Sequence, residues 1–229
     1  MARSEVFRDR ADAGRQLAAD LEEFAGRPSV LVLGLARGGV PVAFEVATAL
    51  EAALDVFVVR KLGVPSREEL ALGAIASGGT RVLNERVARS LDLTDQTIAS
   101  IAAQEQRELQ RQELLYREGR SPEPVGGRTA ILVDDGVATG ASMRAAALAL
   151  REQGAGEVVV AVPVAPPETC AAFEDEVDRV VCAHTPELFS SVGAWYDDFA
   201  QVTDEKVREL LRRAEEQRAH ALPDPAGEQ

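Results

Sequence analysis

Short apolar runs alternate with longer amphipathic segments along most of this 229-residue chain. Each apolar run is four to six residues long and rich in Val and Leu, a pattern typical of strands that are buried on both faces. These predicted strands lie at residues 29–34, 55–59, 130–133, 157–162 and 177–182.

The segments between these runs repeat their apolar residues at helical spacing. Strands that alternate with helices indicate an α/β fold, in which a mostly parallel sheet is flanked by helices on both faces. The first strand, a helix and the second strand form a βαβ unit over residues 29–59. The predicted helices cover residues 5–25, 42–54, 94–118, 142–151 and 203–218, and a further strand pair is predicted at 71–76 and 81–83.

The length of the chain fits one α/β domain. We expect this domain to span residues 1–220, and the Pro- and Gly-containing residues 221–229 to form a disordered tail. With 46% hydrophobic residues, the chain can bury a sizeable core.

Composition restricts the partners and the compartment. The formal net charge is −13, which disfavours nonspecific nucleic-acid binding because such binding needs a cationic surface. No run approaches the roughly 18 apolar residues of a membrane span. The two cysteines, Cys170 and Cys182, lack the spacing of a zinc site, and we expect them to be free, semi-buried thiols. A cytoplasmic protein without structural disulfides, nucleic-acid partners or membrane contacts is therefore expected.

Residues 129–143 (TAILVDDGVATGASM) carry the most chemical information in the chain. An apolar strand leads to two adjacent carboxylates, Asp134 and Asp135, and a loop of small residues then precedes a helix. Backbone N–H groups of such a loop, together with the positive end of a helix dipole, bind anions. The segment suits a ligand with a phosphate at one end and hydroxyls near the carboxylates. The alternative is an ordinary strand-to-helix turn in which one Asp caps the helix.

This segment resembles the signature of the type I phosphoribosyltransferases. The resemblance implies that the loop holds the 5-phosphate of phosphoribosyl pyrophosphate (PRPP), and that Asp134 and Asp135 meet the ribose hydroxyls. It covers roughly residues 5–210 and includes the openings GLARGGVP at 34–41 and RKLGVP at 60–65. The implied PRPP-binding residues are Asp134, Asp135, Gly136, Val137, Ala138, Thr139, Gly140, Ala141 and Ser142.

The resemblance also implies a pyrophosphate site, assembled from two loops. By position, Arg37, Gly38 and Gly39 follow the first strand and would grip pyrophosphate through a forked cation and backbone donors. Arg60 and Lys61 end the predicted second strand, so we expect them at the same edge of the sheet. The alternative for this pair is two solvated cations. Residues 61–69 look like a mobile closing loop, and Asp134, Asp135, Lys61 and Arg37 are the candidate catalytic residues.

The acceptor would be selected by a small variable hood, built from the N-terminal segment and residues of about 184–200. Trp195 and Tyr196 belong to an aromatic cluster that could stack on a planar base. The alternative is that Phe189, Trp195 and Phe199 of this cluster pack in the core. Two positions depart from the family pattern. Gly136 stands where an aliphatic residue is common, which would loosen the loop. Ala138 stands where purine-salvage members often carry Asp, which makes a hypoxanthine–guanine acceptor less expected.

The resemblance implies a Mg²⁺-dependent transfer of the phosphoribosyl group from PRPP to a nitrogenous base or similar small acceptor, with release of pyrophosphate. Mg²⁺ would be held mainly through the substrate, with Asp134 and Asp135 as possible protein ligands. A homodimer is possible in this family. The alternative function is a non-catalytic sensor that binds PRPP without transfer.

Overall fold

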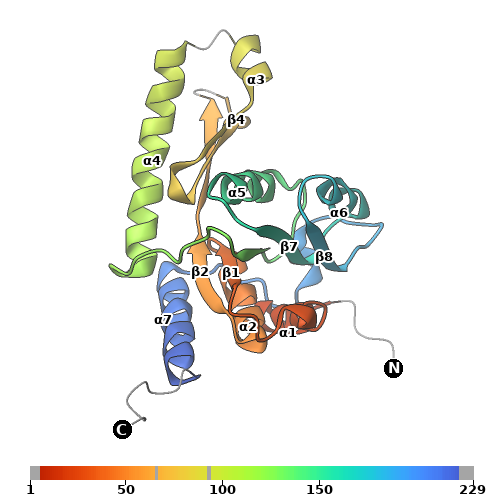
Figure 1. Ribbon diagram of the computed structural model, residues 1–229. Helices are drawn as coiled ribbons and strands as arrows, with labels where there is room; N and C mark the ends of the chain where they lie inside the picture. Colours follow the sequence, from red (N-terminus) through yellow and green to blue (C-terminus); the bar gives the residue numbers. More distant parts are fainter. Residues whose placement is uncertain (1–5, 65–66, 92–93, 222–229) are drawn as a thin grey trace.

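A five-stranded parallel sheet forms the centre of the chain (Figure 1). The computed structural model describes residues 6–64, 67–91 and 94–221. The strand order is β2-β1-β6-β7-β8, which confirms the parallel α/β fold that the alternating pattern predicts. The strands are β1 (Val30–Leu35), β2 (Ala53–Phe57), β6 (Thr129–Val133), β7 (Glu157–Val164) and β8 (Arg179–His184).

Helices cover both faces of this sheet because successive side chains of each strand point to opposite sides. In β1, Val30 and Val32 pack on the face covered by α1 (Arg10–Ala19) and α2 (Gly39–Leu50). Leu31 and Leu33 pack on the other face, against α5 (Ala141–Glu152) and α6 (Pro167–Glu174). The short helix η1 (Glu22–Phe24) follows α1.

A second, antiparallel sheet of three strands extends from the β2 edge (Figure 1). It consists of β3 (Val59–Val64), β4 (Arg67–Ala76) and β5 (Arg81–Leu83), with η2 (Ser77–Gly79) between the last two. The long helix α4 (Asp95–Arg117) and the C-terminal helix α7 (Asp204–Ala221) pack beside it, sharing one apolar cluster, and α3 (Glu85–Ser90) precedes α4.

The second strand of the parallel sheet is shorter than predicted. It ends at Phe57, because the next residue, Val58, directs its backbone groups to Ser77 instead. The Val58 N–H donates to Ser77 Oγ at 2.9 Å, and the Ser77 N–H donates to the Val58 carbonyl at 2.8 Å. Arg60 and Lys61 therefore lie inside β3, and the expectation that they end a parallel strand was wrong.

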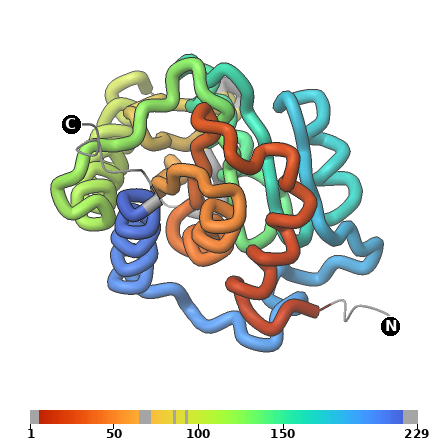
Figure 2. The backbone as a smooth tube through the Cα atoms, turned by 60° about the horizontal axis from the view of Figure 1, so that its bottom comes forward, coloured from red at the N-terminus to blue at the C-terminus, as the bar shows by residue number. Residues whose placement is uncertain are grey.

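The N-terminal segment pairs with the segment that precedes α7, far away in sequence (Figure 2). The Phe7 N–H donates to the Trp195 carbonyl at 2.9 Å, and the Asp197 N–H donates to the Phe7 carbonyl at 2.8 Å. The short helix η3 (Val192–Trp195) lies in this second segment. The two segments from which the sequence predicted a hood thus lie side by side.

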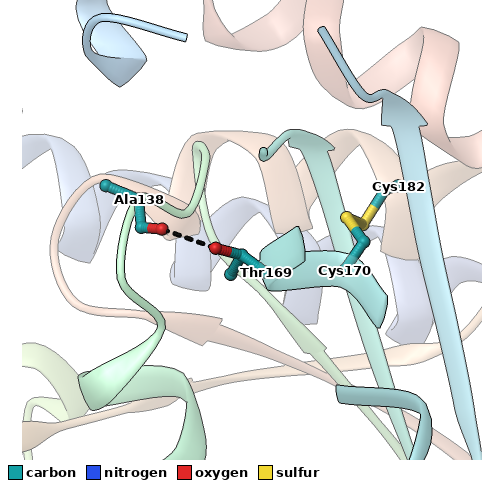
Figure 3. The surroundings of a disulfide bond; sticks show 4 residues. All are labelled: Ala138, Thr169, Cys170 and Cys182. Carbon is teal, nitrogen blue, oxygen red and sulfur yellow. Dashed lines mark hydrogen bonds between the residues drawn. A yellow bond between two sulfur atoms is a disulfide. The ribbon is translucent and has the colours of Figure 1, made fainter. Parts of the chain in front are cut away.

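The expectation of free thiols was wrong. Cys170 of α6 and Cys182 of β8 form a disulfide, with their Cα atoms 6.7 Å apart (Figure 3). Their separation of 12 residues matched no metal motif and gave no sign of contact. Because α6 packs against β8, the fold brings the two side chains together.

Three expectations fall partly outside the described residues. These are the tail from residue 222 onward, the centre of the predicted closing loop at residues 65–66, and the start of the first predicted helix at residue 5. Among the described residues, every helix is too short or too polar to cross a membrane.

Candidate functional site

The predicted site residues converge where the direction of the sheet connections reverses. From β1 the chain runs through α2 to β2, the neighbour of β1 on the side away from β6. From β6 the chain runs through α5 to β7, the neighbour of β6 on the side away from β1. Because β1 and β6 are neighbours, with Gly34 level with Val133, the loops that follow them open side by side. Open α/β sheets bind ligands at such a switch point, at the carboxyl ends of the strands.

The loop after β1 packs directly on the two acidic residues. A Cβ atom added to Gly38 would lie 2.2 Å from Asp135 Oδ2, and one added to Gly39 would lie 2.4 Å from the Val133 carbonyl oxygen. Any side chain at either position would therefore collide with the acidic pair or its strand. Gly38 and Gly39 thus allow the backbone of this loop to lie close to both carboxylates. The Ala36–Arg37 peptide bond of the same loop is cis.

The two carboxylates have unequal surroundings. Asp135 Oδ2 accepts a hydrogen bond from Arg10 Nε at 2.7 Å, and its side chain is 14% exposed. Asp134 Oδ1 accepts the Asp135 backbone N–H at 2.9 Å. Burial, and then the neighbouring Asp135 charge, raise the pKa of Asp134 well above its ordinary value. Burial also raises the pKa of Asp135, but the Arg10 hydrogen bond opposes this shift. We therefore place the negative charge of the pair mainly on Asp135.

The loop after β6 forms an open cradle at the start of α5. Thr139, Ala141 and Ser142 lie at its surface, and Gly140 is the N-cap in the left-handed conformation, with φ of 78°. Within the described structure, no side chain caps this helix, so neither Asp has the capping role that was the alternative interpretation. The first N–H groups of a helix lack partners within the helix, which suits them to an anion.

Gly136 is enclosed rather than loose. A Cβ atom added there would lie 2.6 Å from Val192 Cγ1 and 3.0 Å from Val164 Cγ1. The space that an aliphatic residue would occupy is thus filled from β7 and from η3. The expectation that Gly136 loosens the loop was wrong, because it considered the loop without these neighbours.

A cavity of about 500 Å³ opens over the acidic pair. Arg37 lines it, and the Arg37 guanidinium lies 3.7 Å from Asp204, which also accepts a hydrogen bond from the Tyr116 hydroxyl at 2.8 Å. The lining thus combines cations, two carboxylates and an aromatic ring, groups suited to a charged, partly planar ligand. The lining residues are Arg10, Ala36, Arg37, Gly38, Asp134, Asp135, Phe199, Gln201 and Val202.

Arg60 and Lys61 lie apart from this lining. Arg60 forms two contacts with Glu105 of α4, from Nε at 2.8 Å and from Nη2 at 2.7 Å. Lys61, the next residue of β3, is exposed and points to the opposite face of the hairpin. Their binding of pyrophosphate stays a prediction, and it would require the Arg60–Glu105 pair to open or the hairpin to move.

The hood aromatics contact the acidic loop and an apolar cluster, and their stacking on an acceptor stays a prediction. Tyr196 is buried, its ring lies 5.4 Å from that of Phe7 and 5.0 Å from that of Phe199, and its hydroxyl donates to the Asp135 carbonyl. Trp195 is packed against the same apolar cluster. Tyr196 therefore supports the acidic loop, while Phe199 presents its ring to the cavity.

Sequence reasoning missed Arg10, and it placed Phe199 only within the aromatic cluster of the hood. The Arg10 guanidinium lies 3.9 Å from the centre of the Phe199 ring, and its Nη1 donates to the Ala200 carbonyl at 2.8 Å. Arg10 thereby joins the start of α1, the acidic pair and the hood. The sequence signal was weak, because Arg10 lies among charged residues in the first part of a predicted helix, and this position does not reveal a partner 125 residues away.

The two carboxylates of this site suit a Mg²⁺ ion that is bound mainly by the substrate better than a metal ion that is held by the protein alone. Among the described residues, no group of three or more His, Cys, Asp or Glu side chains could hold a metal. Asp134 and Asp135 offer hard oxygen atoms, and Mg²⁺ commonly takes one or two carboxylates together with phosphate oxygens and water. These two residues are the groups that could complete its coordination.

A larger cavity, of about 690 Å³, lies elsewhere, between α4, β2 and the loop after α4. Its wall contains the buried ion pair of Asp55 and Arg117, with Nε to Oδ1 at 3.1 Å. It contains none of the predicted site residues, so we assign the chemistry to the smaller cavity at the switch point.

Several known proteins are similar to this chain in sequence or in fold. The Phosphoribosyl transferase domain family matches residues 4–193. Two curated relatives from Mycobacterium tuberculosis, of strains CDC 1551 and H37Rv, are each 50% identical over 216 residues, and their names propose a phosphoribosyl transferase. The match covers 94% of this chain and 48% of each relative, so the chain spans about half the length of these proteins.

One solved structure agrees closely in backbone as well as in sequence. It is the crystal structure of TT1426 from Thermus thermophilus, with a TM-score of 0.79 and 44% identity. The match covers 91% of this chain and 98% of that one. The switch-point geometry and these similarities lead to one conclusion: the chain belongs to the Phosphoribosyl transferase domain family.

Proposed function

We propose that this chain transfers the phosphoribosyl group of PRPP to a nitrogen atom of a small acceptor and releases pyrophosphate. The observation that carries the proposal is the packing of Gly38 and Gly39 on the Asp134–Asp135 pair, beside the uncapped start of α5. The order of the glycine loop, the two carboxylates and the uncapped helix start matches the order in which PRPP carries pyrophosphate, ribose and 5-phosphate, and this match supports the proposal.

In this proposal the 5-phosphate binds the N–H groups of residues 138–142, and the ribose hydroxyls bind Asp134 and Asp135. Pyrophosphate binds Arg37, Gly38 and Gly39, and Arg60 and Lys61 join after a movement of the hairpin. Mg²⁺, held mainly by substrate oxygens, would neutralise charge on the departing pyrophosphate.

The acceptor nitrogen forms a bond to the anomeric carbon, the bond from that carbon to the pyrophosphate oxygen breaks, and pyrophosphate leaves with the electron pair. The acceptor then loses the proton from its nitrogen to a base or to water. The anomeric carbon becomes cationic in between, and the negative charge on Asp135 would stabilise it. Arg10 favours this ionised state of Asp135 through its 2.7 Å hydrogen bond.

The acceptor would lie between Phe199 and the ribose. The exposed ring of Phe199 and the guanidinium of Arg10 are the groups of this cavity best suited to a planar base. Ala138 lacks the carboxylate that purine-salvage relatives often carry at this position, so an acceptor other than hypoxanthine or guanine is expected. A cytoplasmic location and a homodimer remain predictions from the sequence.

The test is an assay of pyrophosphate release by the wild-type chain, with Mg²⁺, PRPP and a panel of purines, pyrimidines and simple amines. The proposal predicts release that depends on one acceptor and equals the phosphoribosyl product in amount. The pairing of Arg60 with Glu105 keeps a predicted pyrophosphate ligand out of the cavity, and it favours a second candidate, a PRPP sensor without transfer. Tight binding of PRPP without release for any acceptor would support that candidate and contradict the first.

A further inference from the structure

The loop between β6 and α5, where we place the 5-phosphate, is called the phosphate loop below. It packs against α6, a helix outside the sequence signature (Figure 3). Thr169 Oγ1 donates a hydrogen bond to the Ala138 carbonyl at 2.8 Å. One turn further along α6, the Phe173 ring packs against Gly140, where an added Cβ atom would lie 2.8 Å from Phe173 Cζ. α6 therefore touches the loop at a carbonyl and at its last residue.

A second contact, made by Arg144 of α5, holds the carbonyl of the next loop residue, Thr139. Arg144 Nη1 donates to the Thr139 carbonyl at 2.7 Å, and Arg144 Nε donates to Glu176, just after α6, at 2.8 Å. The Arg144 guanidinium also lies 4.9 Å from the centre of the Phe173 ring. The position of α6 thus affects two consecutive peptide groups of the loop.

These contacts determine where the loop aims its donors. In a planar trans peptide, the carbonyl and the following N–H point in opposite directions. Because the Ala138 and Thr139 carbonyls are held toward α6 and Arg144, the N–H groups of Thr139 and Gly140 point to the opposite side of the loop. That is the side on which we place the 5-phosphate. A shift of α6 would therefore turn both donors.

The position of α6 depends in turn on the disulfide. Cys170, the residue after Thr169, is bonded to Cys182 of β8, so the bridge fixes the turn of α6 that carries Thr169 (Figure 3). The helix has only 8 residues, and within the described structure no side chain caps its start. A helix this short gains little stability of its own and depends on tertiary contacts.

We propose that Thr169 is a positioning residue for the phosphate loop, and that the Cys170–Cys182 bridge makes PRPP binding respond to redox state. The proposal rests on the proposed function. A dithiol reductant supplies two electrons and two protons, which convert the bridge to two thiols while the reductant becomes a disulfide. Reduction frees α6 from β8, loosens the Thr169 contact and weakens the grip on the 5-phosphate.

The surroundings of the bridge permit this exchange. Cys170 is 9% exposed and packs in the core, whereas Cys182 is half-buried, so a small thiol would approach from the Cys182 side. Disulfides in reducing compartments are usually transient and redox-sensing. The bridge lies beside the loop and outside the cavity lining, so reduction changes the site without removing a group that contacts substrate.

The first experiment compares oxidised and dithiol-reduced wild-type chain by calorimetric titration with Mg²⁺ and PRPP. Reduction should weaken PRPP binding about tenfold, the scale of one lost hydrogen bond to the loop, and reoxidation should restore it. The double variant C170S/C182S should bind as weakly as the reduced wild type, with or without reductant. Equal affinity in both redox states would overturn the redox part of the proposal. Absence of PRPP binding by the oxidised chain would instead overturn the proposed function.

The second experiment isolates Thr169 in oxidised protein. Thr169→Val keeps the shape but loses the donor, and it should raise the KM for PRPP about tenfold with little change in kcat. Thr169→Ser restores the hydroxyl and should restore the KM. With PRPP bound, amide exchange at Thr139 and Gly140 should be faster in Thr169→Val and in reduced wild type than in oxidised wild type. A wild-type KM in Thr169→Val, with the disulfide intact, would overturn the positioning role.

Discussion

Two buried acidic centres on nearby strands of one sheet differ in how their charge is balanced. Asp55 of β2 accepts hydrogen bonds from Arg117 Nε at 3.1 Å, from the Val56 N–H at 2.7 Å and from the Glu123 N–H at 3.0 Å. The Asp134–Asp135 pair has one cation, Arg10, for two carboxylates.

The difference distinguishes the site at Asp55, which supports the fold, from the site at which we propose the chemistry. At Asp55 the ion pair is complete, and Arg117 also donates to the Val56 carbonyl at 3.0 Å, which attaches α4 to the sheet. At Asp134 the raised pKa means that folding places an acid where its charge is disfavoured. Such incomplete compensation costs stability and is typical of sites that await a ligand.

The largest effect on stability is expected from breaking the complete pair. Arg117→Met would leave Asp55 buried without its cation and should lower the free energy of unfolding by about 3–5 kcal/mol. Urea unfolding followed by circular dichroism would measure the loss.

The matched control is Arg111→Met on the same helix, where the arginine pairs with Glu108 in an exposed pair. This variant should leave the unfolding midpoint nearly unchanged, because exposed pairs contribute little. Equal losses in the two variants would refute the idea that the Asp55–Arg117 pair fastens α4.

A smaller effect, of opposite sign, is expected at the incomplete pair. Because folding raises the pKa of Asp134, the folded chain binds that proton more tightly than the unfolded chain does. Its stabilising contribution is complete below the unfolded pKa of about 4 and is lost as the pH rises through the raised value. Asp134→Asn avoids this loss and should raise the melting temperature at pH 7.5 by roughly 3–5 °C per pKa unit of elevation.

Melting curves of wild type and Asp134→Asn between pH 4 and 8, without Mg²⁺ or PRPP, would check this prediction. The two curves should converge near pH 4 and separate as the pH rises. A constant gap at every pH would show that the asparagine acts through packing rather than through charge.

The smallest effect is expected at the rim of the phosphate cradle. Ser142 is exposed and can add one hydroxyl to a set of backbone donors. Ser142→Ala should raise the KM for PRPP by about twofold to fivefold, as expected for one solvent-exposed hydrogen bond, and should leave kcat unchanged. Steady-state kinetics would measure the change, and a loss of the fold would contradict the placement of this loop.

Much of the fold and half of the site could be predicted from local patterns. The apolar runs predicted every strand of the parallel sheet, because burial on both faces leaves an unmistakable Val-rich signature. The acidic pair and its loop are contiguous, so the sequence predicted them together.

Contacts between distant segments left no such signal. Arg10 meets Asp135 across 125 residues, Phe199 reaches the cavity from the end of the hood, and the cysteines meet only through the packing of α6 on β8. The exit of the chain from the parallel sheet at Val58 depends on Ser77, a residue far along the chain in the turn after β4. Tertiary packing decides each of these features.

The central claim is that the acidic pair performs chemistry, whereas Asp55 supports the fold. The most direct test measures PRPP-dependent pyrophosphate release per folded molecule in Asp135→Asn and in Asp55→Asn, with the unfolding midpoint of each. We predict that Asp135→Asn loses about 100-fold or more in kcat at an unchanged or higher midpoint. Asp55→Asn should keep its turnover while its midpoint falls. Near-normal release by Asp135→Asn, with the acceptor that the wild type uses, would contradict the account.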